Sequence, residues 1–300
     1  MLENFSNREL AIGFWLLILL VLVIYKKDTR HSLWDLLKAF FDRKLIGWHI
    51  SMVLYVSLTV FILFKIGLWE FKLLKDTIIW YIVTAIPSTI KSINEAKDMK
   101  YFKEMAKNNL SIGVLVGFIV DSYNFSLICE IILISLFVFL SLMVGIAEHK
   151  VEYENKEYEV TANLLRHTTA GVGLFLIFSS LNRFLSDIKN IVLLELIKDF
   201  ILPITLSMIF IPYIYFLVLY SSYEKLFMRL NFKKTIDDKY RTFLYLKILL
   251  FCRFNINRVN NFIDYSEIMK SYVKSKDDIN RLFKNYKINA RTQKALNLQR

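Results

Sequence analysis

The sequence has 300 residues, of which 55% are hydrophobic and 22% are charged, with a formal net charge of +12 and 2 cysteines. The mean hydropathy is +0.41, so apolar and charged residues must be segregated along the chain. With 8 glycines and 3 prolines, the chain has few of the turn-forming residues that a turn-rich β fold needs. The composition predicts an all-α polytopic membrane helix bundle.

The first apolar segment covers residues 10–25 and ends in Lys26 and Lys27, with no small-residue cleavage site after it. We therefore expect a retained membrane anchor rather than a signal peptide. Residues 32–43 alternate apolar and charged side chains at helical spacing, which predicts an interfacial helix on the inner leaflet. By the positive-inside rule, the lysines and arginines between positions 26 and 44 place this segment in the cytosol.

Residues 45–64 and 73–90 are the second and third predicted spans, joined by a short connection into a helical hairpin. Tryptophans at positions 48, 69 and 80 lie near the predicted ends, where indole rings prefer the headgroup layer. The lysine-rich segment 91–107 then returns the chain to the cytosol.

The next apolar stretch covers residues 110–147, and its best single span is 126–147. Residues 110–120 are too short to cross and are predicted to be an interfacial or re-entrant piece, or an extension of the following helix. The acid-rich residues 148–160 are placed outside, where a small hairpin around Asn155 is one alternative. Residues 169–181 are predicted to be re-entrant or buried against the bundle.

The final predicted span covers residues 191–220, and 30 residues of helix are roughly 45 Å long, more than the hydrocarbon core requires. After it the composition changes, because residues 223–300 carry 18 basic and 7 acidic side chains, a net charge of +11. We therefore expect a transmembrane domain over residues 1–222 and a basic cytosolic helical domain over residues 223–300. About five crossings then leave the N-terminus outside and the C-terminus in the cytosol of a bacterial inner-membrane protein.

Polar residues and prolines within predicted spans are the first group of candidate functional residues, because hydrocarbon makes polar groups costly unless they face protein or water. Internal ion pairing and static helix kinks are the alternatives to a role in conduction. The candidates for a pore or gate are Thr84, Pro87, Ser88, Glu130, Asp199, Pro203 and Pro212.

The sequence contains no recognisable catalytic motif. The 4 histidines are scattered, and no spacing of histidine, cysteine and carboxylate predicts a metal site. There is no glycine-rich phosphate loop and no nucleophile elbow. We expect no enzymatic activity, no metal and no cofactor.

The basic tail interleaves cations with aromatic residues. One interpretation is a positive-inside tail that contacts anionic lipid. The other is phosphate-backbone binding, with rings stacked on unpaired bases. The candidate residues for nucleic-acid binding are Lys233, Lys234, Lys239, Tyr240, Arg241, Arg253, Arg258, Lys284, Tyr286, Lys287 and Arg291.

The layout of apolar bundle plus basic domain resembles that of membrane effectors of bacterial anti-phage systems, the Hailong effector among them. The stretch GLWEFKLLKDTIIWYIVTAIP at residues 67–87 looks like a motif of bacterial membrane proteins. The resemblance implies an ion-channel domain coupled to a domain that binds single-stranded DNA made by a partner nucleotidyltransferase.

The leading hypothesis is an oligomeric, ligand-gated ion channel of a defence system, with a nucleic acid or nucleotide as its ligand. Symmetric assembly of a homo-oligomer would create the pore, since one chain has few internal surfaces for it. The alternative is a transporter or accessory membrane subunit whose basic tail docks on anionic lipid or on a protein partner.

Overall fold

The computed structural model describes residues 5–153, 158–187 and 193–298, and it confirms an all-α polytopic membrane protein. The described chain contains six helices that are long and apolar enough to cross a membrane. They are Asn7–Tyr25, Leu45–Lys65, Phe71–Glu95, Leu127–Val151, Glu159–Ser186 and Lys198–Asn231. The chain forms two compact units, one of residues 1–54 and 111–200 and the other of residues 55–110 and 201–300.

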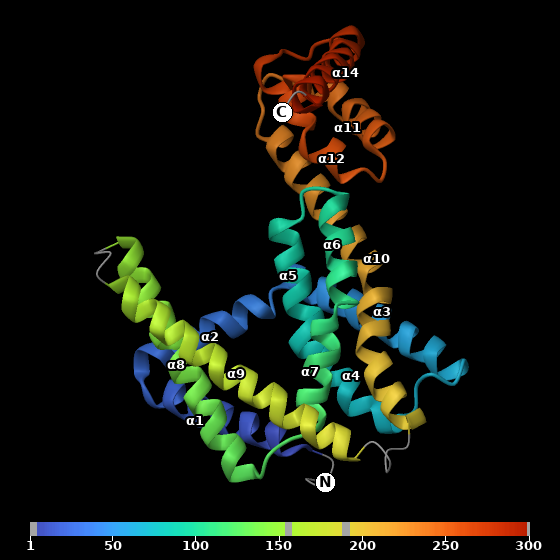
Figure 1. Ribbon diagram of the computed structural model, residues 1–300. Coiled ribbons are helices and arrows are strands. Elements are labelled where there is room, and N and C mark those ends of the chain that lie inside the picture. The colour runs from blue at the N-terminus through green and yellow to red at the C-terminus, as the bar shows by residue number, and fades with distance from the viewer. Residues whose placement is uncertain (1–4, 154–157, 188–192, 299–300) are drawn as a thin grey trace. The chain divides into compact units, whose positions relative to one another are not determined.

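The first unit is built mainly from five helices. They are α1 (Asn7–Tyr25), α2 (Lys27–Phe40), α7 (Ile112–Ser122), α8 (Leu127–Tyr153) and α9 (Glu159–Asp187). Helix α1 begins with a reciprocal cap in which Ser6 and Glu9 satisfy each other's backbone N–H groups. Helices α8 and α9 pack side by side, and α1 packs against α8 (Figure 1).

Helix α9 differs from the expectation for residues 169–181. Instead of a re-entrant piece, the structure has one continuous helix of 29 residues. Arg166 and Arg183 limit the apolar window in the sequence but do not end the helix, because each finds a partner: Arg166 pairs with Glu148 at 2.6 Å, and Arg183 donates to the Asn124 carbonyl at 2.8 Å. The hairpin around Asn155 is also wrong where its residues are described, since residues 151–153 and 159–160 are helical.

The second unit contains the remaining spanning helices. They are the latter part of α3 (Arg43–Lys65), the run η2 (Phe71–Leu73), α4 (Leu74–Trp80), η3 (Tyr81–Ala85) and α5 (Ile86–Glu95), then α6 (Met99–Asn109) and most of α10 (Leu193–Asn231). Two hydrogen bonds tie these helices to α10: the Trp80 indole donates to the Ser207 hydroxyl at 2.9 Å, and the Tyr55 hydroxyl donates to the Ile209 carbonyl at 2.7 Å. Such polar contacts complement apolar packing inside a bundle.

Helix α10 is a single helix of 39 residues. At about 1.5 Å per residue it is roughly 58 Å long, about twice the hydrocarbon thickness. The expected end of the last span at residue 220 and the expected domain boundary at residues 222–223 both fall inside it. The helix therefore continues from the apolar span into the basic region without a break.

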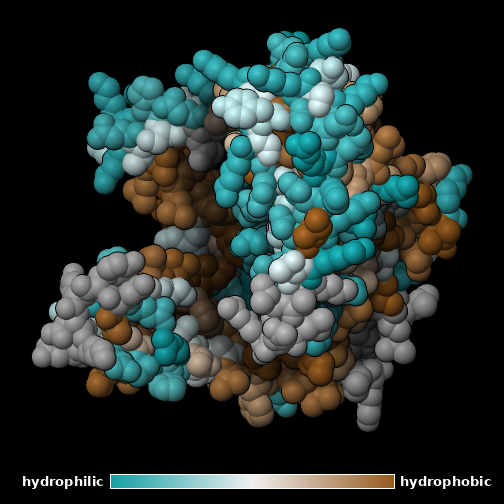
Figure 2. All heavy atoms as spheres, turned by 90° about the horizontal axis from the view of Figure 1, so that it is seen from above, coloured by the Kyte–Doolittle hydropathy of each residue, from teal (hydrophilic) through white to brown (hydrophobic). Residues whose placement is uncertain are grey.

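The C-terminal part of the second unit is a small helical assembly: α11 (Asp238–Cys252), α12 (Ile256–Asn260), α13 (Phe262–Ser266), η5 (Ile268–Lys270) and α14 (Lys276–Leu298). Its fully buried side chains include Leu244, Ile248, Phe262 and Ile279, so residues of α11, α13 and α14 share a core. Seen from above, these helices present mainly hydrophilic side chains (Figure 2).

Candidate functional site

Glu130, a candidate pore residue, is buried at 1% exposure and forms an ion pair with Arg8. The contact is bidentate: the Arg8 Nε donates to one carboxylate oxygen at 3.1 Å, and Nη2 donates to the other at 3.0 Å. Arg8 also donates to the Val120 carbonyl at 2.7 Å. This geometry compensates both charges, as a buried pair requires.

The connection between α7 and α8 is held by the same cluster. The Phe125 N–H donates to Glu130 Oε1 at 2.9 Å, and the Asn7 side chain donates to the Phe125 carbonyl at 2.9 Å. One residue after Glu130, the Ile131 carbonyl accepts a hydrogen bond from the Trp15 indole at 3.0 Å. The first residues of α1 and α8 therefore lie at the same end of the first unit.

The last turns of α9 reach this end as well. The Ser180 hydroxyl donates to the Tyr123 carbonyl at 3.3 Å, and the Arg183 guanidinium lies 4.3 Å from the centre of the Phe125 ring. The starts of α1 and α8 and the ends of α7 and α9 thus meet. Glu130 has the contacts of a structural anchor for this junction.

The third spanning run contains a π-helix at residues Tyr81–Ala85, just before Pro87. Proline has no N–H, so the α-helical ladder cannot continue through it, and the wider turn accommodates the break. Thr84 and Ser88 are half-buried, and Pro87 is exposed. Thr84 lies within this local irregularity, and Pro87 and Ser88 follow it. Such irregularities often mark a functional position in a helix.

The other membrane candidates lie on α10. Asp199 and Pro212 are exposed and Pro203 is half-buried. Both prolines lie inside the continuous helix. Asp199 and Glu130 belong to the first unit, whereas Thr84, Pro87 and Ser88 belong to the second.

Most cationic candidates of the basic tail have exposed side chains. They are Lys234, Lys239, Arg253, Arg258, Lys284, Lys287 and Arg291. Tyr240 is half-buried, and the Lys239 ammonium lies 5.9 Å from its ring centre. These residues come from α11, α12, α14 and the connections before and after α11.

Three further predicted binding residues are buried or half-buried and make contacts within the domain. Lys233 donates from Nζ to the carbonyls of Ile268 and Ser271, and its burial lowers the pKa of the ammonium. Arg241 donates to the Asn231 carbonyl at 3.1 Å. Tyr286 is buried, and burial raises the pKa of its hydroxyl to about 12. Its ring packs in the domain core and is not presented for base stacking.

Arg253 marks a sharp turn after α11, with φ of 48°, a conformation that non-glycine residues rarely adopt. The turn is fastened to α10: the Tyr223 hydroxyl donates to the Arg253 carbonyl at 2.6 Å, and the Tyr215 hydroxyl donates to the Phe254 carbonyl. Arg258 donates to the Phe251 carbonyl at 3.2 Å. The end of α11 is therefore held against a helix that also contains a candidate membrane span.

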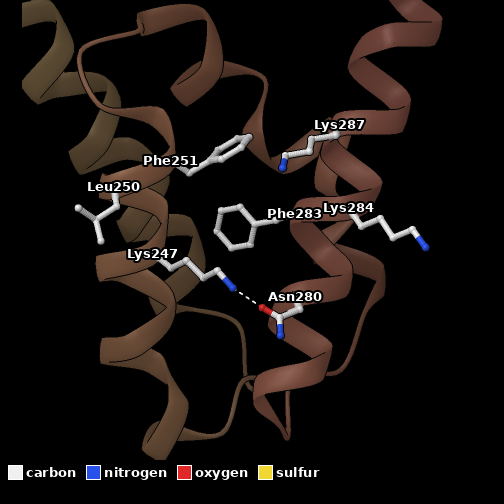
Figure 3. A pocket seen from close by; sticks show the side chains of 7 residues that line it. All are labelled: Lys247, Leu250, Phe251, Asn280, Phe283, Lys284 and Lys287. Atoms are coloured by element: carbon white, nitrogen blue, oxygen red, sulfur yellow. Dashed lines mark hydrogen bonds between the residues drawn. The ribbon is translucent and has the colours of Figure 1, made fainter.

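A pocket of about 460 Å³ lies between α11 and α14. We call it the lysine–phenylalanine pocket, and it is lined by Lys247, Leu250, Phe251, Asn280, Phe283, Lys284 and Lys287. Figure 3 shows Phe251 and Phe283 pointing into the space between the two helices, Lys287 near Phe251, and Lys247 bonded to Asn280; Lys284 extends away.

Sequence reasoning named Lys284 and Lys287 but missed Lys247 and the two phenylalanines as a site. The signal was present in the spacing, because Lys247 and Phe251 are four residues apart, as are Phe283 and Lys287. Each pair shares a helix face. Both phenylalanines resemble ordinary core residues until the facing helix is known.

No protein-family model, curated protein or solved structure matches this chain.

Proposed function

We propose that the chain is a ligand-gated ion channel that assembles as a homo-oligomer, with the basic C-terminal helices as its ligand-sensing part. The proposal rests on one observation above all: α10 is both a candidate membrane span and a packing partner of the C-terminal helices. A ligand that shifts the C-terminal helices would act directly on a membrane helix.

The contacts that couple α10 and its neighbours to the C-terminal helices extend beyond the turn at Arg253. Besides the Tyr223 and Tyr215 hydroxyls, the Tyr245 ring on α11 stacks on Phe227 of α10 at 4.7 Å between ring centres. Asn260 also donates to the Lys97 carbonyl at 3.2 Å, which links α12 to the connection between α5 and α6. The π-helix Tyr81–Ala85 directly precedes α5. Irregular turns of this kind absorb small shifts of a helix.

The setting we propose is bacterial anti-phage defence, which is supported by the resemblance in layout to membrane effectors. In that setting a partner nucleotidyltransferase would make the nucleotide or single-stranded DNA ligand. Growth arrest by membrane depolarisation would be the output. Symmetric assembly would provide the pore, and the exposed apolar side chains of α1 and α8 are suited to lipid or to a neighbouring subunit.

We also propose an orientation with the N-terminus outside and the C-terminus in the cytosol. The lysines after α1 favour the cytosol, so the start of α1 lies outside, and the start of α8 lies with it. Residues 91–107 are lysine-rich and favour the cytosol as well. The chain must then cross between residues 107 and 127, and α7 is the helix available there.

Helix α7 has 11 residues and is about 16 Å long, roughly half of the hydrocarbon core. It would be a discontinuous crossing of the sort seen where neighbouring protein satisfies the broken backbone. Added to the six longer helices, it makes the number of crossings odd. That reconciles the basic C-terminal helices with a cytosolic location.

Single cysteines test this orientation. Cys129 would be replaced by alanine, and Cys252 can stay, because burial raises the pKa of its thiol to about 12 and keeps it unreactive. We expect a membrane-impermeant maleimide to label Ser122→Cys on intact spheroplasts, but Lys107→Cys and Lys270→Cys only after permeabilisation. Labelling of Ser122→Cys and Lys107→Cys from the same side would contradict the crossing by α7.

Ion flux into proteoliposomes tests the coupling. Tyr223→Phe removes the hydroxyl that donates to Arg253, and a hydrogen bond of about 0.5–1.5 kcal/mol corresponds to a few-fold change in an equilibrium. We expect ligand-dependent flux to fall by about that factor while ligand binding is retained. The matched control is Tyr220→Phe, an exposed tyrosine on the same helix. Flux that never depends on ligand would favour a transporter or accessory subunit instead.

A further inference from the structure

We propose that the lysine–phenylalanine pocket binds one nucleotide unit, a phosphate group attached to a nucleobase. The inference deepens the proposed function, because this pocket would be the sensing site. It rests on the placement of two lysines and two phenylalanines on facing helices.

The charge of the pocket selects an anion. Three lysines line it and no acidic residue does. Lys284 and Lys287 form no ion pair within the part of the chain that the structure describes, so Lys287, beside Phe251 in Figure 3, is available to a ligand. Lysine binds phosphate as a compact point charge.

The aromatic lining selects a flat group next to that anion. Phe251 is half-buried, and its ring meets Phe283 edge to face at 5.1 Å between centres. The Arg258 guanidinium lies 5.7 Å from the centre of the Phe251 ring, which also lines the pocket. Phenylalanine faces stack on nucleobases in proteins that bind unpaired strands.

The pocket is held in place by the domain core. The Phe262 ring, which is fully buried, packs against both Phe283 and Tyr286. Lys247 is oriented by its bond to Asn280 and lies 5.1 Å from the Phe283 ring centre. A preformed site of this kind binds ligand with little loss of side-chain freedom.

The size of the pocket limits the ligand. A volume of about 460 Å³ lies in the usual range of small-molecule sites, about 300–1,000 Å³. It suits one nucleotide rather than a long strand lying across the domain. The nucleotide can be free or can be the 5′-phosphorylated end of a short single strand.

Calorimetric titration of the full chain in nanodiscs of neutral lipid tests the site, with inorganic phosphate, AMP and 5′-phosphorylated and unphosphorylated dT4 as probes. We expect AMP or phosphorylated dT4 to bind more tightly than inorganic phosphate. Lys247→Ala and Lys287→Ala should each weaken that binding roughly tenfold. The matched control Lys270→Ala removes an equal charge from an exposed position outside the pocket and should change affinity less than about twofold.

Phe251→Leu removes an aromatic ring from the pocket and keeps its lysines, so it tests stacking independently of charge. It should weaken AMP or dT4 binding and leave inorganic phosphate unchanged, with an unaltered melting temperature as the folding control. Tighter binding of AMP than of phosphorylated dT4 would identify a free nucleotide as the source, and the reverse would identify a strand end.

The proposal is overturned if no probe binds at millimolar concentration, if the lysine variants bind like wild type, or if anionic vesicles compete with every probe equally well. Ligand binding without any ion flux would leave this site intact and remove the channel proposal. Ion flux that depends on another ligand, without binding at this pocket, would remove this site and leave the channel proposal intact.

Discussion

Replacing Glu130 with alanine is expected to destabilise the protein by about 3–5 kcal/mol, because the Arg8 side chain, which is only 16% exposed, loses its bidentate partner and keeps the more distant Asp121 at 4.0 Å. The same change frees the Phe125 N–H and loosens the junction of α7, α8 and α9. The loss is measurable as a lower melting temperature in detergent and as aggregation on size-exclusion chromatography.

The double variant Arg8→Met, Glu130→Leu separates structure from conduction. It removes both charges together, and apolar replacement of a buried pair is often close to neutral. We expect it to be more stable than Glu130→Ala. The matched control is Glu148→Ala, which breaks the exposed pair with Arg166 and should cost about 0–1 kcal/mol. A stable Glu130→Ala protein with altered ion selectivity would instead give Glu130 a role in the pore.

Phe262→Ala is expected to cost about 3–5 kcal/mol, as for other large-to-small changes in a packed core. Phe262 is 0% exposed and contacts two rings of α14. The lysine–phenylalanine pocket should be lost with it, because Phe283 would no longer be held. Chemical denaturation of the full chain, followed by tyrosine fluorescence, measures the change.

The control for this variant is Phe232→Ala, since Phe232 is 82% exposed. Surface changes are usually within about 0.5 kcal/mol. If Phe262→Ala unfolds at the same denaturant concentration as Phe232→Ala, the C-terminal helices do not form the core described above.

The helical membrane fold was predictable because long apolar runs with few glycines and prolines have few other solutions. The helix at residues 238–252 and the short apolar helix at 112–122 follow from local pattern in the same way. The full length of α9 was missed because Arg166 and Arg183 bound the uninterrupted apolar run, and their partners, Glu148 and the Asn124 carbonyl, lie in other segments.

The candidate site was predictable only in part. The pattern of basic and aromatic residues identifies Lys284 and Lys287, which lie on the surface. The same pattern cannot distinguish these exposed residues from Lys233 or Tyr286, whose burial depends on how α10, η5 and α14 pack together. Glu130 likewise signals a costly buried charge, but its partner Arg8 is 122 residues away in the sequence. Long-range pairing of this kind is a property of the fold.

Recording from planar bilayers that contain the purified protein tests the central claim, that a ligand at the C-terminal helices opens an ion pore. The account predicts discrete unitary currents that appear when AMP or 5′-phosphorylated dT4 is added on the side of the C-terminal helices. It predicts that Lys287→Ala needs a higher ligand concentration for the same open probability, whereas Lys270→Ala behaves like wild type. Bilayers that stay silent with ligand on either side, although calorimetry shows the pocket to be occupied, would contradict it.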